Sequence, residues 1–176
     1  MVWKPRRVIT AHDAEGRSTI LFDDHDGQVQ EMASMPGLAL TDIWETTSSP
    51  SLNTGEDDAV ARPVRLAPTS GGSIFRVVEF PPDSAWRGNA DASAAFASIG
   101  AETAHDSGSS DPMRHKTSTI DYIFVLSGEI EALVDTGAVL LKAGDAFVQR
   151  GTVHSWSVKG DQPCIVAVVL IDAVPI

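Results

Sequence analysis

Apolar residues in the last third of the chain come in short runs that are broken by glycine-containing turns. Strands are expected over residues 119–126, 130–135, 139–141, 146–149, 154–158 and 164–171. Short strands at this close spacing are typical of a sandwich, a jelly roll or a barrel. No helical pattern is long enough to cover a parallel sheet, so the chain is predicted to be all-β with little helix.

The N-terminal half predicts fewer strands and longer connections. Residues 7–10 and 18–22 flank a polar stretch with a glycine and are expected to form an N-terminal hairpin. Further strands are expected over residues 38–46 and 73–80, and a short helix over residues 92–98. These elements complete an all-β prediction.

Residues 47–72, between the strands expected over 38–46 and 73–80, are rich in Ser, Pro, Gly, Asp and Glu and are expected to form a long loop. Such loops are often functional, for example as a lid or a dimer arm; a mobile surface insertion is the alternative. A length of 176 residues suits one hydrophobic core. We therefore expect a single domain, 1–176, with N-terminal strands (1–46), the loop, a strand and irregular connection (73–112) and the main strands (113–172).

The amino-acid composition limits the binding partners and the cellular compartment that we expect for this protein. A formal net charge of -11 argues against nucleic acid and membrane surfaces, because binding phosphates needs clustered Lys and Arg. Cys164 is the only cysteine, which excludes a disulfide framework and favours a reducing compartment. No apolar run has the length of a signal peptide or a membrane span, so we expect a soluble, cytoplasmic protein.

One expected strand carries polar residues within an apolar run. Because side chains alternate across a strand, its two faces hold His115, Thr117, Thr119, Asp121, Ile123 and Val125 on one side and Ile120, Tyr122, Phe124 and Leu126 on the other. Both faces are largely apolar, so we expect the strand to be buried on both sides. Its polar side chains must then be satisfied inside the fold.

Asp121 is the most informative of these residues, because a buried aspartate needs a cation, a metal or several donors beside it. If the fold brings His154 opposite this strand, His115, Asp121 and His154 supply two imidazoles and one carboxylate. This set suits one divalent ion (Fe, Mn, Ni or Zn). Without metal, it is an acid/base set with mutually perturbed pKa values.

Each of the three residues also has a structural explanation. In these explanations, Asp121 would be a structural carboxylate paired with Arg76 or Arg150, and His115 would lie at the mouth of a loop. His154 would donate to a backbone carbonyl beside Trp156. Their convergence in one apolar interior favours a functional site over these separate explanations.

The spacing of these residues resembles the cupin superfamily, in particular its small single-domain members. The first cupin motif has two His two positions apart, then an acidic residue and a Gly; in those places stand His115, Thr117, Asp121 and Gly128. In place of the second motif, which runs Gly, Pro-Gly and His, stand Gly144, Arg150, Gly151 and His154. Residues 8–16 and 75–80 also resemble bacterial and fungal cupins, some found in secondary-metabolite pathways. The resemblance implies a jelly-roll barrel or sandwich and a homodimer in which N-terminal strands add to the neighbouring sheet.

Two departures from the family pattern change the expected chemistry. Thr117 replaces the second metal histidine, and Asp121 is one methylene shorter than the usual Glu, so a site of three His and one Glu does not form. Either fewer protein ligands and water hold the metal, or no metal is required. Threonine is a poor ligand for these ions, which favours a site that works without tightly bound metal.

The first functional hypothesis is a lyase or isomerase acting on a small oxygenated, polyketide-like compound by dehydration, decarboxylation or a proton shift. His115 and His154 are the candidate base and acid, and Asp121 orients or charges one imidazole. The candidate substrate-binding residues are Thr117, Phe147, Gln149 and Trp156. Two alternatives are a metal-dependent oxygenase or lyase that uses the same three residues, and a non-catalytic module that binds a small molecule.

Overall fold

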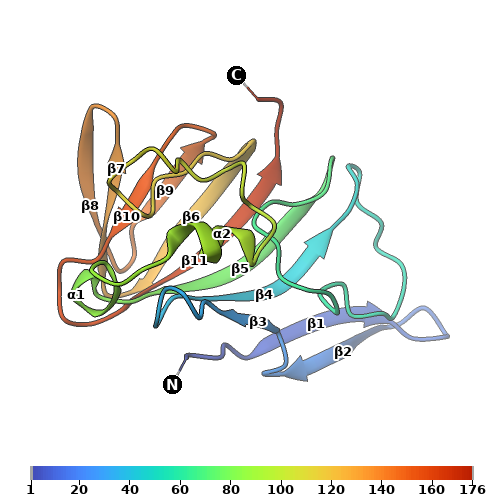
Figure 1. Ribbon diagram of the computed structural model, residues 1–176. Coiled ribbons are helices and arrows are strands. Elements are labelled where there is room, and N and C mark those ends of the chain that lie inside the picture. Colours follow the sequence, from blue (N-terminus) through green and yellow to red (C-terminus); the bar gives the residue numbers. More distant parts are fainter. Residues whose placement is uncertain (1, 176) are drawn as a thin grey trace.

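The computed structural model describes residues 2–175, which fold into short strands and two short helices (Figure 1). In chain order the elements are β1 (Arg7–His12), β2 (Ser18–Asp24), β3 (Gln28–Glu31), β4 (Ala39–Thr46), β5 (Ser73–Phe80), α1 (Asp83–Trp86), α2 (Ala92–Ala97), β6 (Thr119–Ser127), β7 (Glu129–Val134), β8 (Gly137–Lys142), β9 (Ala146–Arg150), β10 (Ser155–Ser157) and β11 (Cys164–Asp172). The predicted all-β fold with little helix is confirmed. Within residues 2–175, no helix has the length and apolar character needed to span a membrane.

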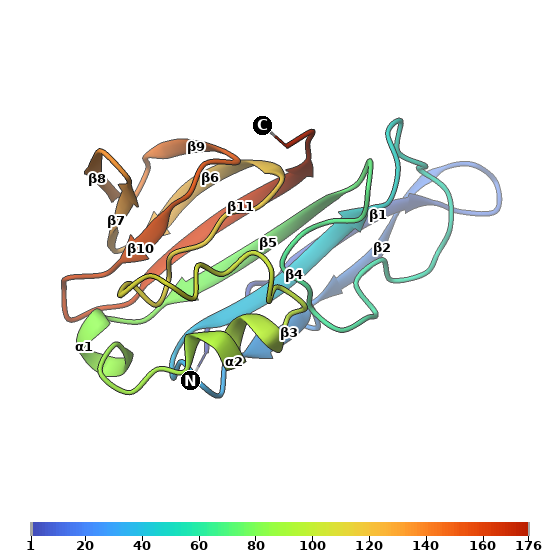
Figure 2. The ribbon, with the colours of Figure 1, turned by 45° about the horizontal axis from the view of Figure 1, so that its top comes forward.

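Two sheets form a jelly-roll sandwich. The larger sheet has six strands in the order β3-β4-β5-β11-β6-β9, and the smaller has three in the order β10-β7-β8. Figure 2 shows the smaller sheet gathered at one side of the larger one, with α2 and the connection after it lying over the same face of the long strands. The core lies between these layers.

Alternation along the strands turns one face of each sheet toward the core. On β11 the buried positions are Cys164, Val166, Val168 and Leu170. Ile130 from the smaller sheet and Phe96 from α2 belong to the same core cluster. Because full burial of such a side chain contributes about 1.5–3 kcal/mol, this layer dominates the stability of the sandwich.

β6 differs from the prediction on one face. Its odd-numbered side chains are buried as expected, but Tyr122, Phe124 and Leu126 are 46%, 52% and 47% exposed. The prediction that this strand is buried on both sides was wrong. Alternation shows which residues share a face, not what covers that face.

β1 and β2 pair with each other as predicted and form a two-stranded sheet of their own within the described residues. Figure 1 shows this hairpin in blue, at the opposite side of the molecule from β7 and β8. Arg7 fastens it to the rest of the chain, because its buried guanidinium pairs with Asp24 at 2.7 Å and with Asp58 at 2.6 Å. Asp58 belongs to the long loop, so the loop ties the hairpin down.

Residues 47–72 contain no helix or strand, as predicted. Their second half packs on the larger sheet, where Val60 and Val64 are buried and Arg62 pairs with Asp42 at 2.9 Å. β3 and α1 were not expected from the sequence; each has four residues, too few for a periodic pattern.

The turn between β6 and β7 requires glycine at position 128. The φ angle of Gly128 is +75°, and an added Cβ would lie 2.6 Å from the carbonyl oxygen of Pro163. Any side chain would therefore collide with the backbone that leads into β11.

Candidate functional site

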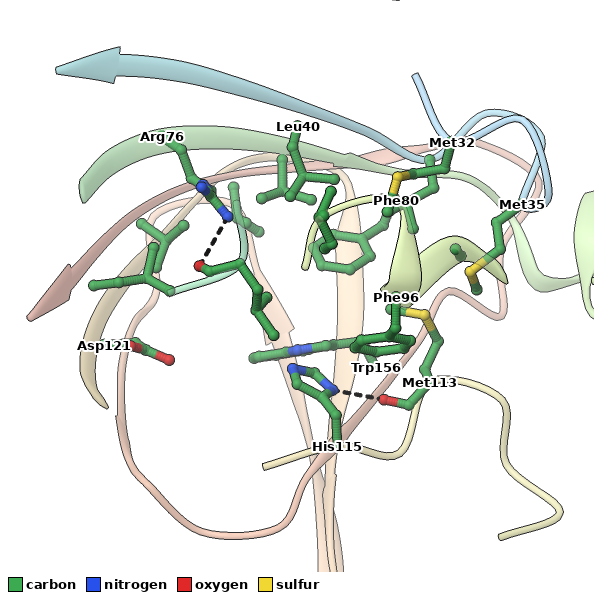
Figure 3. A pocket seen from close by; sticks show the side chains of 18 of the residues that line it. Met32, Met35, Leu40, Arg76, Phe80, Phe96, Met113, His115, Asp121 and Trp156 are labelled. Carbon is green, nitrogen blue, oxygen red and sulfur yellow. Dashed lines mark hydrogen bonds between the residues drawn. The ribbon is translucent and has the colours of Figure 1, made fainter. Parts of the chain in front are cut away.

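A cavity of about 100 Å³ lies between the two layers. Four polar side chains, those of Arg76, His115, Asp121 and His154, reach its otherwise apolar wall. The apolar lining shown in Figure 3 includes Met32, Met35, Leu40, Phe80, Phe96, Met113 and Trp156. A mostly apolar pocket with a few convergent polar groups is typical of a small-molecule site.

The backbone brings His115 and His154 together. The N–H of each residue donates to the carbonyl of the other, at 3.0 Å in both directions. Residues paired in this way across an antiparallel bridge project their side chains to the same face. The two ring centroids are accordingly 4.2 Å apart, with 54° between the ring planes.

A backbone carbonyl orients each imidazole. His115 Nδ1 lies 2.7 Å from the carbonyl oxygen of Met113, and His154 Nδ1 lies 3.0 Å from that of Thr152. A carbonyl oxygen only accepts, so each Nδ1 carries the proton and each neutral ring keeps a lone pair on Nε2. The orienting role expected of Asp121 is thus taken by these carbonyls.

Burial keeps both imidazoles neutral. Desolvation, with the neighbouring His154 adding to it, lowers the pKa of His115 to about 3. Desolvation also lowers the pKa of His154, against the opposing effect of its bond to Thr152. At neutral pH, the imidazoles of His115 and His154 therefore line the cavity as two uncharged bases.

Asp111 clamps the two histidine segments together. Its carboxylate accepts from the Met113 N–H at 3.0 Å and from the Ser155 hydroxyl at 2.6 Å. Arg87 pairs with it at 2.9 Å and donates to the Trp156 carbonyl at 2.7 Å. Burial opposes ionisation of Asp111, but the Ser155 hydroxyl and Arg87 outweigh it and hold the pKa of Asp111 below its ordinary value.

Gln149 supports the carbonyl that orients His154. Its Nε2 donates to the Thr152 carbonyl at 2.9 Å and to the Thr152 hydroxyl at 2.5 Å. The side chain is buried but lies outside the cavity lining. Its position is therefore behind His154 rather than against a bound molecule.

Thr117 and Phe147, two further candidates from the sequence, also lie outside the cavity lining, whereas Trp156 lies within it. The Thr117 and Thr119 hydroxyls are hydrogen-bonded to each other at 2.7 Å. Phe147 packs edge-on against Trp156, with ring centroids 5.9 Å apart, and so supports the cavity wall from outside.

Asp121 reaches the cavity without joining the histidines. Burial raises its pKa to about 6, with Thr119 and the charge of Arg76 acting in the opposite direction. Arg76 pairs with Asp42 at 2.8 Å, and among the described residues Asp121 forms no ion pair with Arg76 or Arg150, the structural alternative considered for it. Among residues 2–175, no three His, Cys, Asp or Glu side chains are grouped so that they could hold a metal ion.

Arg76, Phe96 and Met113 line the cavity although the sequence did not identify them as site residues. The only signal for Arg76 was its place inside the apolar run of β5, which is unusual for a charged residue. Phe96 stands in a short helix, and nothing in the local pattern shows that the helix covers the cavity.

Comparison with known proteins places this site in a family. The cupin domain family matches residues 102–170. Phomopsin biosynthesis cluster proteins C' and D of Diaporthe leptostromiformis are each 34% identical over 161 residues, which cover 86% of this chain and 69% of theirs. The cupin-domain-containing oxidoreductase fogC of Aspergillus ruber is 28% identical over 156 residues, 85% of this chain and 62% of the relative. A solved structure, the putative ethanolamine utilization protein Q of Salmonella typhimurium, covers 98% of this chain and 99% of that chain, at 11% identity and a TM-score of 0.45. With a family match across the segment that holds the histidine pair and a 34% identical relative along most of its length, the chain belongs to the cupin family.

Proposed function

We propose that this cupin is a small-molecule enzyme in which the pair His115 and His154 moves a proton within an oxygenated substrate. The observation that carries the proposal is the pair of neutral imidazoles whose Nε2 lone pairs are free in an apolar cavity. Relatives named as biosynthesis cluster proteins and as cupin-domain oxidoreductases support small-molecule chemistry. We favour a lyase or isomerase that carries out dehydration, decarboxylation or a proton shift.

In a dehydration, one imidazole Nε2 takes a proton from the carbon beside a carbonyl. The C–H bond breaks, an N–H bond forms and the electron pair stays on the substrate as an enolate. The enolate electron pair then forms a C=C bond while the C–O bond breaks, and the imidazolium gives the same proton to the departing hydroxyl, which leaves as water. Because burial lowers the pKa of both imidazoles, the ring that takes the proton returns it readily. The Nε2 of the other imidazole accepts a hydrogen bond from the substrate hydroxyl, so turnover needs both residues.

A second candidate is a metal-dependent oxygenase or lyase, favoured by the orientation of the same histidines and by the oxidoreductase names of two relatives. Histidines that ligate metal usually donate the other ring N–H to a carbonyl or carboxylate, as His115 and His154 do. These two residues would hold the ion, which would polarise a substrate oxygen when bound. Asp121 does not join them, so the protein ligand set is smaller than the sequence suggested.

The test is turnover in His115→Ala and His154→Ala, with His25→Ala as a matched control because His25 is exposed. A panel of hydroxyketones and keto acids is incubated with each protein, and products are identified by mass. We expect loss of at least about 100-fold in both cavity variants, with an unchanged circular dichroism spectrum, and full activity in the control. Full activity in both cavity variants rules out the assignment.

Metal content separates the two candidates. Protein purified without chelator is analysed for Fe, Mn, Ni and Zn, and turnover is measured with and without a chelator. Substoichiometric metal and chelator-insensitive turnover support the metal-free mechanism. Stoichiometric metal with chelator-sensitive turnover supports the second candidate, and ligand binding with no product supports a binding module.

A further inference from the structure

One polar atom in the cavity wall lacks a partner. Asp121 is 5% exposed, and its Oδ1 is buried without a hydrogen bond in the described part of the chain. A buried acceptor left unpaired costs about 1–3 kcal/mol. Since the same side chain lines the cavity, the missing partner is naturally a donor on a bound molecule.

Arg76 offers a donor on the same wall. Its guanidinium donates three hydrogen bonds: from Nε to the Asp42 carboxylate at 2.9 Å, from Nη2 to the Arg65 carbonyl at 2.6 Å and from Nη1 to the Leu66 carbonyl at 3.2 Å. A guanidinium has five N–H groups, with two on Nη1, so one Nη1 hydrogen has no acceptor among residues 2–175. The side chain is 1% exposed and is fixed by these bonds.

Strand register places the two groups on one part of the inner face. Val168 of β11 pairs with Arg76 of β5, and Leu170, on the same face two residues on, pairs with Asp121 of β6. The two backbone positions are thus about 12 Å apart, from two strand spacings across the sheet and two residues along it. The Arg76 guanidinium is held by Asp42 of β4, the neighbour of β5 on the side away from β6. Arg76 and Asp121 form no ion pair, although the charge of Arg76 acts on Asp121.

This polar end is separate from the histidines. Figure 3 shows Arg76 and Asp121 on one side of the pocket, while His115 lies toward Phe96 and Met113. Neither histidine is hydrogen-bonded to Asp121 in the described part of the chain: their Nδ1 atoms bond Met113 and Thr152, and Asp121 Oδ1 has no partner. The cavity therefore has two polar ends with apolar side chains between them.

Charge decides which chemical group suits the Arg76 end. The buried network sets Arg62, Arg65 and Arg76 against Asp42 and Glu45, and the Asp121 carboxylate balances the remaining positive charge. Because the group is then neutral overall, a bound anion or a bound cation would add a buried charge that no opposite charge compensates. A carbonyl would accept from Arg76 but leave Asp121 Oδ1 unpaired. A neutral hydroxyl donates to Asp121 Oδ1 without adding a charge to the site.

We propose that Asp121 Oδ1 accepts a hydrogen bond from a neutral hydroxyl group, phenolic or alcoholic, of a largely apolar substrate whose reacting carbon lies at His115 and His154, while the charge of Arg76 keeps this end of the cavity neutral overall. The inference rests on the proposed function for the location of the reacting carbon, but the hydroxyl subsite itself is defined by binding. The proposed substrate therefore carries a hydroxyl group and no charge at the end that lies away from the reacting carbon.

The test compares three probes of similar shape by isothermal titration calorimetry: 4-methylphenol, toluene and 4-methylbenzoate. In the wild type we expect 4-methylphenol to bind about tenfold more tightly than toluene, because it gives the unpaired carboxylate oxygen a hydrogen bond, and 4-methylbenzoate to bind most weakly. Equal binding of 4-methylphenol and toluene, or tightest binding of 4-methylbenzoate, overturns the proposal.

Variants assign the preference to Asp121. In Asp121→Leu, which has a similar shape and no acceptor, 4-methylphenol and toluene are expected to bind within about twofold of each other. Asp121→Asn keeps an acceptor oxygen and should retain most of the preference, while binding 4-methylbenzoate more tightly than the wild type does. Ile123→Val is the control from the same wall and should leave the preference intact. An unchanged tenfold preference in Asp121→Leu contradicts the proposal.

These outcomes are distinct from those of the catalytic test. If the histidine variants lose turnover while the probes show no hydroxyl preference, the subsite is wrong and the proposed function stands. If the preference follows Asp121 while the histidine variants keep full turnover, the subsite stands and the catalytic assignment fails.

Discussion

Burial of titratable residues sets the expected pH behaviour of this protein. His115 is held neutral and Asp121 is held toward its protonated form by the same low-polarity surroundings. Each of these shifts is also a contribution to the free energy of unfolding, because the unfolded chain returns both groups to their ordinary proton affinities. The two residues therefore predict opposite responses to pH.

His115 should make the protein less stable as the pH falls. In the unfolded chain this residue takes up a proton near pH 6.5, whereas in the folded chain it stays neutral down to about pH 3. Its contribution is fully present above pH 6.5 and is lost progressively toward pH 3. Urea unfolding of the wild type and His115→Gln between pH 4 and 7.5 should show a shallower pH dependence in the variant. Parallel pH dependences would contradict this account.

Asp121→Asn should stabilise the protein above pH 6. The rise in the pKa of Asp121 from 3.8 to about 6, at about 1.4 kcal/mol for each tenfold change in proton affinity, corresponds to about 3 kcal/mol against the buried charge. Stability of the wild type falls as the pH rises through this interval, because the folded state holds the proton more tightly. Chemical unfolding should therefore show a gain for Asp121→Asn at pH 8 that disappears at pH 4; a loss at pH 8 would contradict it.

At the scale of elements, the histidine geometry depends on the junction between β9 and β10. The Gln149 side chain donates two hydrogen bonds to Thr152, and the carbonyl oxygen of Thr152 accepts the bond that orients the His154 ring. We expect Gln149→Leu to lower the free energy of unfolding by about 1–2 kcal/mol and to reduce turnover, because His154 loses part of its support. Arg150→Ala, at an exposed neighbour on β9, should change stability by less than about 0.5 kcal/mol. Equal effects of the two substitutions would show that Gln149 has no special role.

The sequence predicted the elements better than it predicted the site. The hairpin and the β5 to β11 strands follow from apolar alternation and turn residues, and His115 and His154 were correctly expected to meet. The separation of Asp121 from them was not predictable, because it depends on the register of β6 against β11 rather than on spacing along the chain. Likewise, the cavity role of Arg76 depends on its bonds to Asp42 and Leu66, which lie far from it in sequence.

At the scale of the whole molecule, an uncovered apolar row crosses the outer face of the larger sheet. Strand register aligns Phe75, Val169, Tyr122 and Val148 across four neighbouring strands. Three of them, Phe75, Tyr122 and Val148, are 40%, 46% and 52% exposed. A contiguous apolar patch of this kind marks an interaction surface. The β1–β2 hairpin, which pairs with no other strand among residues 2–175, also offers strand edges for pairing.

We expect this surface to join two copies of the chain. Light scattering coupled to gel filtration should give about twice the 18.7 kDa mass of one chain for the wild type. The double variant Tyr122→Glu with Phe124→Glu should elute at the mass of one chain, because burying two carboxylates against an apolar surface is strongly unfavourable. Leu52→Glu, at an exposed apolar residue of the long loop, should remain dimeric. A wild type of single-chain mass would contradict the expectation.

The central claim, that His115 and His154 present neutral Nε2 lone pairs to the cavity, is tested most directly by nitrogen-15 NMR of the histidine rings during a pH titration. We predict that both rings carry their proton on Nδ1 and that His115 stays neutral down to about pH 3, because burial lowers its pKa. A proton on Nε2 of either ring at neutral pH, or titration of His115 near its ordinary pKa of 6.5, would contradict it.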